Sequence, residues 1–302
     1  MASDDKLTSL LSRASVEISS RGHQLPQLRD HFGADTDVTI TFLPGDNYRH
    51  NIETATALRR AGFNPVPHIA AREMASREML DDFLGRLRGE ADVTRVLLIA
   101  GDAALTRGPF KSSLDVGASS LIEAHGIRSV SVAGHPEGHP YLAAAEASKV
   151  LEAWRDWGVK TGTRVSVMTQ FCFESTPILE WIGALERRGI DLPVIVGLAG
   201  PATPATLTKF ALRCGVGNSM RALRGQIGRF GRLLTDTGPD EVMRGLRAAP
   251  PAATAPIAGF HLFPFGGLRK AGDWLRDYAT ACGQSALRTT ERAMSPTTSQ
   301  KP

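Results

Sequence analysis

Eight short runs of β-forming residues recur along this chain of 302 residues, and a stretch with helical periodicity follows each of them. This alternation predicts parallel strands flanked by helices. The predicted strands are Ser15–Ser19, Asp37–Leu43, Pro65–Ala70, Thr94–Ala100, Ser129–Ala133, Arg164–Phe171, Pro193–Leu198 and Ile257–Phe263. Eight strand–helix units in about 280 residues fit a closed (β/α)8 barrel, the TIM barrel. An open doubly wound sheet of eight strands is the alternative.

Helical stretches separate these strands, and two of them are extra helices before the eighth strand. The predicted helices are Leu25–Phe32, Asn51–Ala61, Ser76–Leu87, Ser113–His125, Leu142–Trp157, Thr176–Arg188, Pro204–Cys214, Ser219–Leu234, Asp240–Ala248 and Leu268–Ala281. We expect residues 1–287 to form a single barrel domain. The segment 288–302 is polar and lacks periodicity, so we expect it to be a disordered tail.

The composition excludes several classes of protein. With 42% hydrophobic and 22% charged residues, the chain has the make-up of a globular protein. A net charge of +4 and 6% aromatic residues give no nucleic-acid signature, although the mild positive excess suits an anionic small ligand. No apolar run approaches the roughly 20 residues that span a bilayer, and MASDDKLTSLL does not resemble a signal peptide. We therefore expect a cytoplasmic protein without nucleic-acid or membrane partners, and its state as a monomer or homo-oligomer is left open.

The cysteines do not indicate a disulfide framework or a zinc site. Cys172, Cys214 and Cys282 lie far apart, are odd in number and form no C-x-x-C pair. We expect reduced thiols that are mostly buried. A reactive Cys172 is the alternative.

In a barrel of this kind, the active site lies at the carboxyl ends of the strands. Polar residues collect at those ends, namely Glu17, Thr41, His68, Arg72, Asp102, His135, Glu137 and Gln170. Glu17 stands between Val16 and Ile18 in an otherwise apolar strand. A carboxyl group that points into the barrel loses solvation, which raises its pKa toward the range of a general acid. An outward-facing surface Glu is the alternative interpretation.

Two further residues at the strand ends are candidates for binding or catalysis. Asp102 follows Gly101, so a carboxylate emerges where the fourth strand ends, unless it only caps a turn or helix. Gln170 has apolar neighbours, Met168 and Phe171, and its amide has donors and acceptors that suit the edge of a heterocycle. A hydrogen-bonded core Gln is the alternative for Gln170.

Other local patterns do not predict a phosphate loop, a serine hydrolase or a metal. His135, Glu137 and His139 in HPEGHP have H-x-E-x-H spacing, but a turning loop does not aim alternate side chains at one point, so no metal is expected. Gly215-x-Gly217-x-x-Met220 lacks the third glycine of a dinucleotide fingerprint and follows a helix. The chain contains neither G-x-x-x-x-G-K-[ST] nor G-x-S-x-G.

Taken in order, these segments resemble the methylenetetrahydrofolate reductase family, whose members are flavin-dependent (β/α)8 barrels. The family reduces 5,10-methylenetetrahydrofolate to 5-methyltetrahydrofolate with NADH or NADPH. The likeness runs from about Ser15 to Ala281 and is carried by VTITF, PHIAAR, AGD, HPEGHP, TQFCFE, VGLAGPATPATLTKFA and FHLFPFGG. It implies an FAD cofactor, a folate substrate and a place in one-carbon metabolism and methionine biosynthesis. The choice between NADH and NADPH is left open.

The resemblance also implies roles for individual residues. Glu17 is similar to the family's catalytic acid, which protonates N10 of the folate so that its five-membered ring opens. Asp102 is similar to the carboxylate near flavin and folate, Gln170 to the amide that binds the pterin, and Thr206 to a polar residue that touches substrate. The implied flavin contacts are Thr41, His68, Gly101, Asp102, His135 and His139, with Arg155 as a basic phosphate contact.

Departures from the family pattern keep other interpretations open. Ala100 stands in place of the arginine of an Arg-Gly-Asp motif, so a cation that would pair with flavin phosphates is missing. His135 replaces a common tyrosine, Gly266 and Gly267 replace Asn-Arg, and SSRG follows Glu17 where the family has an aromatic residue and prolines. The runner-up function is a folate-binding barrel with another one-carbon role, such as a tetrahydrofolate-dependent demethylase or methyltransferase, or a flavin-free reductase. A non-catalytic partner subunit is a third interpretation.

Overall fold

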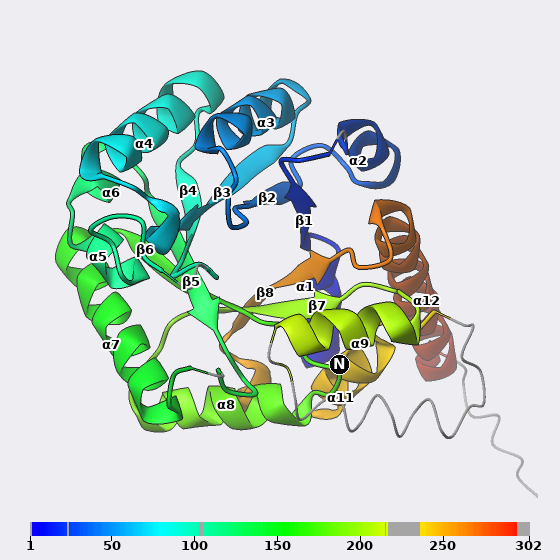
Figure 1. Cartoon of the computed structure of the whole chain (residues 1–302). Coiled ribbons are helices and arrows are strands. Elements are labelled where there is room, and N and C mark those ends of the chain that lie inside the picture. Colours follow the sequence, from blue (N-terminus) through cyan, green and yellow to red (C-terminus); the bar gives the residue numbers. More distant parts are fainter. Residues whose placement is uncertain are drawn as a thin grey trace, which may run out of the picture.

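The protein forms a closed parallel barrel surrounded by helices in a computed structural model (Figure 1). The structure describes residues 2–22, 24–102, 105–139, 141–214, 216 and 236–294. The strands follow one another around the barrel in sequence order, and β8 closes it by pairing in parallel with β1. This topology confirms the predicted (β/α)8 barrel and excludes the open doubly wound sheet.

The eight strands agree with the predicted ones to within two residues at each end. They are β1 (Ser15–Ser19), β2 (Asp37–Thr41), β3 (Asn64–Ala70), β4 (Arg95–Ile99), β5 (Ser129–Gly134), β6 (Arg164–Thr169), β7 (Val194–Ala199) and β8 (Ile257–Phe263). Each strand places alternate side chains inside the barrel and against the helices. The carboxyl ends of the strands therefore present inward-facing side chains at one end of the barrel.

The helices cover the outside of the barrel. They are α1 (Ala2–Leu11), α2 (Leu25–His31), α3 (Tyr48–Arg60), η1 (Ala71–Glu73), α4 (Arg77–Ala91), α5 (Ser113–Gly117), α6 (Leu121–Ala124), α7 (Ala144–Thr161), α8 (Thr176–Arg187), α9 (Pro204–Arg213), α11 (Asp240–Ala248), η2 (Pro251–Thr254) and α12 (Leu268–Met294). Ser76 caps α4, as expected, because its hydroxyl accepts a hydrogen bond from the backbone of Met79. The extra helix Asp240–Ala248 is confirmed, whereas the predicted helix Ser219–Leu234 lies outside the described residues.

Several helix boundaries differ from the sequence prediction. Helix α1 was not predicted, and the single helix expected over Ser113–His125 is divided into α5 and α6, because Ser120 has a left-handed backbone with φ of 60°. Helix α7 runs past Gly158 and ends at Thr161, where Gly162 caps it with a φ of 70°. Helix α12 continues to Met294, so residues 288–294 of the predicted tail are helical, and residues 295–302 lie outside the described part.

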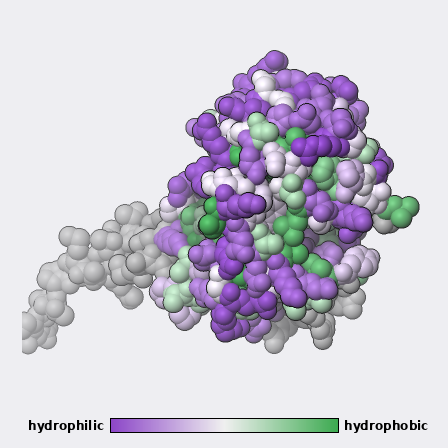
Figure 2. Space-filling model, turned by 90° about the vertical axis from the view of Figure 1, so that its left-hand side faces the viewer, coloured by the Kyte–Doolittle hydropathy of each residue, from purple (hydrophilic) through white to green (hydrophobic). Residues whose placement is uncertain are grey.

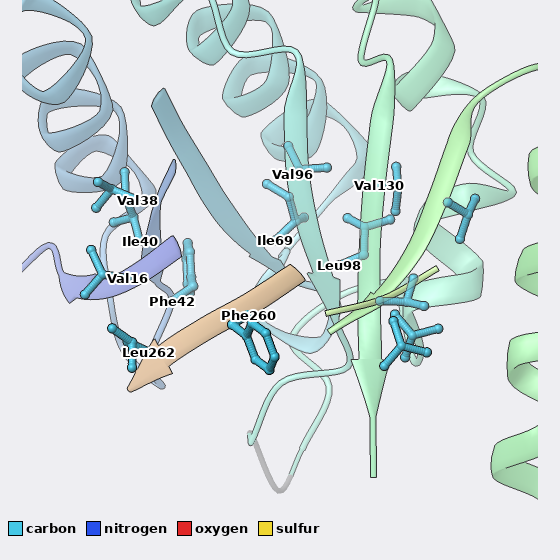
Figure 3. Close-up of a cluster of buried hydrophobic side chains, with 14 of the residues drawn as sticks. Val16, Val38, Ile40, Phe42, Ile69, Val96, Leu98, Val130, Phe260 and Leu262 are labelled. Atoms are coloured by element: carbon cyan, nitrogen blue, oxygen red, sulfur yellow. The ribbon is translucent and has the colours of Figure 1, made fainter. Parts of the chain in front are cut away.

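The main hydrophobic core lies between the barrel and the helices (Figure 3). Outward-facing strand residues such as Val16, Val38 and Leu262 are fully buried there. The opposite faces of the helices are polar, and hydrophilic residues cover most of the face shown in Figure 2. Across the described residues, no helix combines the length and apolar character that crossing a membrane requires.

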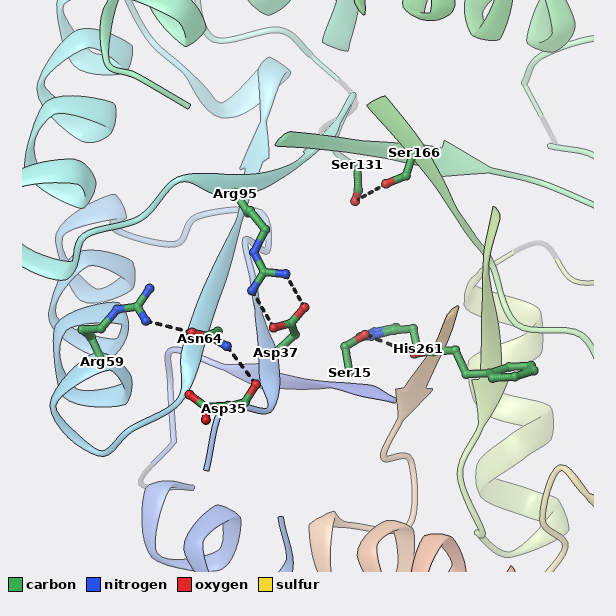
Figure 4. Close-up of polar contacts among 10 residues, drawn as sticks. Ser15, Asp35, Asp37, Arg59, Asn64, Arg95, Ser131, Ser166 and His261 are labelled. Carbon is green, nitrogen blue, oxygen red and sulfur yellow. Dashed lines mark hydrogen bonds and ion pairs between the residues drawn. The ribbon is translucent and has the colours of Figure 1, made fainter. Parts of the chain in front are cut away.

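Several polar side chains make contacts inside the barrel, in contrast to the apolar layer around it (Figure 4). Near the amino ends of the strands, both guanidinium Nη atoms of Arg95 donate to the carboxylate of Asp37. Ser131 Oγ and Ser166 Oγ are 2.9 Å apart, and Ser15 Oγ lies 2.8 Å from Nδ1 of His261. TIM barrels are more often filled by branched apolar side chains, so these polar contacts are a departure from the usual packing of a barrel interior.

Candidate functional site

A cavity of about 400 Å³ opens at the carboxyl ends of the strands. It is lined by Glu17, Ile18, Ser19, Gln24, Thr41, Phe42, Leu43, His68, Leu97, Ile99, Asp102, Ala133, Gly134, His135, Met168, Thr169, Gln170, Phe210, Arg213, Cys214, Phe263, Pro264 and Phe265. Six predicted site residues contribute to this lining, and they come from six consecutive strands or strand ends: Glu17, Thr41, His68, Asp102, His135 and Gln170. The order β1 to β6 therefore places these side chains around one space, as expected for a barrel.

Glu17 and His68 face each other inside this cavity. Oε2 of Glu17 lies 3.8 Å from Nε2 of His68, and the Glu17 side chain is 20% exposed. Burial raises the pKa of Glu17 to about 7 and lowers the pKa of His68 to about 4, because it disfavours the charged form of each group. At neutral pH His68 is therefore uncharged, and Glu17 keeps its proton on about half of the molecules. The expected rise in the pKa of Glu17 is confirmed.

Further buried polar groups lie near Glu17 inside the barrel. Thr39 pairs with Glu17 in the register of β1 and β2, and its hydroxyl is buried without a hydrogen-bond partner among the described residues. Nε2 of His68 and Nε2 of His261 are in the same situation. Burial, and secondarily His68, lowers the pKa of His261 to about 3. The polar side chains near this carboxyl group are thus uncharged at neutral pH, in contrast to the paired charges at the amino ends.

The ends of β4 and β5 bring an exposed carboxylate close to two histidines. Gly101 has a φ of 91°, which a residue with a side chain rarely adopts, and this turn carries Asp102 to the cavity. The rings of His135 and His139 meet edge to face with centroids 4.7 Å apart. Burial, and then His139, lowers the pKa of His135 to about 4; the pKa of His139 is lowered by burial and by Arg72. Both imidazoles are therefore neutral hydrogen-bonding groups at neutral pH.

Gln170 lies where β6 ends, on the side of the cavity formed by α9. Its backbone N–H donates to the carbonyl of Gly134 at 2.8 Å, which fixes the chain at this point. Its side chain hydrogen-bonds with Cys214, whose pKa is raised to about 11 by burial first and by Asp102 next. Cys214 is therefore a thiol at neutral pH. Oε1 of Gln170 accepts a hydrogen bond from the backbone N–H of Phe171 at 3.2 Å, and the side chain lines the cavity.

One wall of the cavity consists of aromatic rings that sequence analysis did not select. Phe210 of α9 and Phe265 after β8 stack with centroids 4.1 Å apart and an interplanar angle of 19°. Phe263 lies nearly parallel to Phe265 at 5.7 Å. The signal was present in the FPF sequence that follows β8 and in the face of α9 shared by Phe210, Arg213 and Cys214. A flat ligand can stack against this wall while the opposite side offers polar groups.

The remaining predicted site residues do not line the cavity. Thr206 lies in the first turn of α9, where its hydroxyl is 2.9 Å from that of Thr203, one turn before Phe210 on the same helix face. Arg155, predicted as a phosphate contact, lies away from the cavity. Its guanidinium is held by Asp156 and by the carbonyl of Gly189, which precedes β7 at the amino ends of the strands. Gly101 and His139 adjoin the cavity through Asp102 and His135.

The structure also decides the alternative for Cys172. This residue is 1% exposed, and burial together with the nearby Glu137 raises the pKa of its thiol. A buried, protonated thiol is a poor nucleophile, so the reactive interpretation is not supported. The side chain of Cys282 lies outside the described part of the chain. Within that part, no three His, Cys, Asp or Glu residues are grouped so that they could hold a metal ion.

Comparison with known proteins gives the family of the chain. The family model for methylenetetrahydrofolate reductase matches residues 23–217. A 5,10-methylenetetrahydrofolate reductase from Pectobacterium carotovorum subsp. carotovorum is 27% identical over 176 residues, which cover 58% of this chain and 56% of that protein. The chain thus spans about half the length of this curated relative. Glu17 and the aromatic residues after β8 lie outside the range of the family model.

Among solved structures, the fold is similar to that of an uncharacterized protein from Clostridium thermocellum that binds two copies of 5-methyl-5,6,7,8-tetrahydrofolic acid. The two chains superpose with a TM-score of 0.56 and 11% identity, covering 90% of this chain and 98% of the other. This likeness extends to the barrel fold and no further. Because the family model matches more than half of the sequence, the chain belongs to the methylenetetrahydrofolate reductase family.

Proposed function

We propose that this protein reduces 5,10-methylenetetrahydrofolate to 5-methyltetrahydrofolate with a bound flavin and with NADH or NADPH as the hydride donor. The observation that carries the proposal is the placement of the Glu17 carboxyl group, whose pKa burial raises to about 7, in a cavity that also presents Asp102 and Gln170. Family membership and the folate ligands of the Clostridium thermocellum protein support a folate-related function.

The residues around the cavity fit a flavin ring. The hydroxyl of Thr41 is buried and has no partner among the described residues, and Nε2 of His68 is likewise free to bind a ligand. The positive φ of Gly101 brings the backbone to the cavity edge without a side chain in the way. Thr41, His68, Gly101, Asp102 and His135 would hold the ring. A bound flavin would supply the hydride that reduces the one-carbon unit of the folate.

Glu17 supplies the proton in this proposal. The bridging carbon of the substrate accepts a hydride poorly until the bond to N10 breaks, and breaking that bond requires a proton on N10. A carboxylic acid whose pKa lies near 7 holds a proton at neutral pH and can release it to a nearby base. His68 cannot compete for that proton, because burial lowers its pKa to about 4. Gln170 would hold the pterin edge so that N10 faces Glu17.

A second function is favoured by one observation. Ala100 removes the cation that the resemblance leads us to expect next to Gly101, and Arg155 faces the other end of the barrel. A flavin-free reductase, or a folate-binding barrel with another one-carbon role such as a demethylase or methyltransferase, needs the same pterin site but not the flavin phosphates. The two functions therefore differ in the cofactor and agree on the folate.

The visible absorbance spectrum of the purified protein separates the two functions. Flavin bands in the protein as isolated, or after incubation with excess FAD and removal of the unbound cofactor, support the reductase with flavin. A protein that stays colourless yet binds 5-methyltetrahydrofolate supports the flavin-free alternative. A protein that binds neither compound contradicts both.

A further inference from the structure

Arg72 is a cation at the cavity rim that none of the roles above uses. It lies in η1, directly after β3, and its backbone N–H donates to the carbonyl of Ala100 at 2.9 Å. This bond continues the pairing of β3 with β4, in which Ala70 lies opposite Ile99. Arg72 is therefore next to the position where the arginine of the family motif is replaced by Ala100.

The side chain of Arg72 is directed along the rim toward the ends of β4 and β5. Its Nε donates to the carbonyl of Lys111 at 3.1 Å. Its positive charge helps to lower the pKa of His139, whereas the charge of Asp102 raises it. Arg72 and the cavity residue Asp102 therefore act on the same imidazole. Among the described residues, no carboxylate lies within ion-pair distance of Arg72, and the same is true of Lys111.

The loop that carries Lys111 is fastened to η1. The backbone N–H of Arg107 donates to the carbonyl of Arg72 at 2.9 Å, and Nε of Arg107 lies 3.2 Å from Oε2 of the buried Glu73. A Cβ at Gly108 would overlap the carbonyl oxygens of Met74 and Ala75, so the loop backbone packs directly on the segment that follows η1. Arg107 is paired with Glu73, so Arg72 and Lys111 are the cations on this part of the rim that have no carboxylate partner among the described residues.

We infer that Arg72, supported by Lys111, binds the diphosphate of a dinucleotide cofactor whose ring enters the cavity beside Gly101. An arginine with free Nη groups can form paired, charge-assisted hydrogen bonds with phosphate oxygens. The inference rests on the proposed function, which requires a dinucleotide at this site. The same chemistry belongs to a flavin dinucleotide and to a nicotinamide dinucleotide, and the binding experiment distinguishes them.

The test measures binding rather than turnover. Dissociation constants are obtained for FAD and riboflavin, and for NADH and reduced nicotinamide riboside, which lacks the diphosphate. The proteins are the wild type, Arg72→Gln and the control Arg164→Gln, which removes an exposed arginine at the amino end of β6. Thermal unfolding of each variant verifies that it is folded.

We expect Arg72→Gln to weaken binding of one dinucleotide by about 10- to 100-fold while leaving its phosphate-free analogue within about 2-fold. Arg164→Gln should change neither. If only FAD shows the loss, the diphosphate is that of the flavin; if only NADH does, it is that of the hydride donor. Equal affinity of wild type and Arg72→Gln for both dinucleotides overturns the inference.

Two measurements keep the inference independent of the variant and of the proposed function. In the wild type, a dinucleotide must bind more tightly than its phosphate-free analogue, and this advantage must shrink as salt is raised from about 0.05 to 0.5 M. A dinucleotide that binds no better than its analogue overturns the inference without any substitution. Binding of 5-methyltetrahydrofolate to the same preparations tests the folate site separately, because Arg72 does not line the cavity.

Discussion

The Asp37–Arg95 pair at the amino ends of the strands and the Glu17–His68 pair at the carboxyl ends share one barrel interior, but their electrostatics differ. Arg95 and Asp37 are joined by two hydrogen bonds between opposite charges and are each about one third exposed. Glu17 and His68 are 3.8 Å apart, and burial keeps His68 neutral and raises the pKa of Glu17 to about 7. The first pair satisfies its polar atoms, whereas Nε2 of His68 has no partner in the described part of the chain.

This difference separates stability from chemistry within one fold. Paired charges with complementary geometry add to folding, or cost little, because each polar atom keeps a partner. A buried acid without a counter-charge lowers the free energy of unfolding at neutral pH, and it is retained where a proton is needed. We therefore expect a substitution that removes one partner at the amino end of the barrel to lower stability. A substitution at the carboxyl end should lower activity first.

The largest expected effect is that of Glu17→Gln on folate reduction. Glutamine keeps the size of the side chain but has no proton of suitable acidity, so we expect a loss of about 10²- to 10⁴-fold in the step that reduces methylenetetrahydrofolate. Reduction of the enzyme by the nicotinamide should be close to that of the wild type. Stopped-flow measurement of the two half-reactions decides the matter, and Asp102 becomes the next candidate if the variant's folate step is unimpaired.

The next effect is that of Gln170→Ala, which removes the amide on the pterin side of the cavity. A ligand polar group left without its partner costs about 1–3 kcal/mol, so we expect folate turnover to fall by roughly 5- to 150-fold. Nicotinamide oxidation with an artificial electron acceptor should change little. Gln27→Ala, on the exposed side of α2, is the matched control. Equal losses in both assays would make Gln170 a structural residue.

Glu17→Gln should also change stability. We expect the variant to be more stable than the wild type at neutral pH, although it is less active. The pKa of Glu17 is raised from 4.5 to about 7 by burial, so the folded state binds its proton more tightly than the unfolded state. The free energy of unfolding of the wild type therefore falls as pH rises from about 4.5 to 7, because the unfolded state releases its proton in this range while the folded state still holds it. Above that range this group causes no further change. The variant should become the more stable protein by about 1–3 kcal/mol at pH 7.5. Urea unfolding at pH 4.5 and 7.5 measures the crossover, and a difference independent of pH would contradict it.

The smallest expected effect is that of Arg95→Met at the amino end. It leaves Asp37 without its guanidinium partner, and because both side chains are partly exposed we expect a loss of about 1–2 kcal/mol in the free energy of unfolding. Binding of 5-methyltetrahydrofolate should not change. A double-mutant cycle with Asp37→Asn isolates the pair interaction. If Arg95→Met weakened folate binding more than it lowered stability, the assignment of stability to the amino end and of chemistry to the carboxyl end would be wrong.

The fold was accessible from sequence because strand and helix periodicities alternate so regularly. Strand β8, at Ile257–Phe263, matches its predicted bounds, and Ser76 caps its helix as expected. The break at Ser120 was missed because a left-handed residue other than glycine or asparagine leaves no reliable sequence signal. Gly158 suggested a helix end, but it allows close packing, since a Cβ there would lie 2.8 Å from Val165 Cγ2.

The candidate site was only partly accessible from sequence. Residues at strand ends, such as Glu17 and Gln170, could be selected because barrel topology gathers those ends. The aromatic wall could not, because Phe210 lies on a helix whose position over the cavity depends on packing. Arg155 is the opposite case. The sequence correctly predicted that this residue lies on a helix, now α7, but it lies so far along the helix that its side chain is near the amino ends of the strands, away from the cavity.

The closure of β1 against β8 has a consequence for the order in which this protein becomes functional. Only two residue pairs, Ser15 with His261 and Val16 with Leu262, join these strands, and the seam lies beside Glu17. A ribosome makes Glu17 before it makes residues 261–265, so a nascent chain carries the acid before it has the strand and the aromatic residues that complete the cavity. An amino-terminal fragment ending before β8 contains Glu17 but no closed cavity, and adding the missing carboxyl-terminal fragment in trans would turn ligand binding into a direct readout of barrel closure.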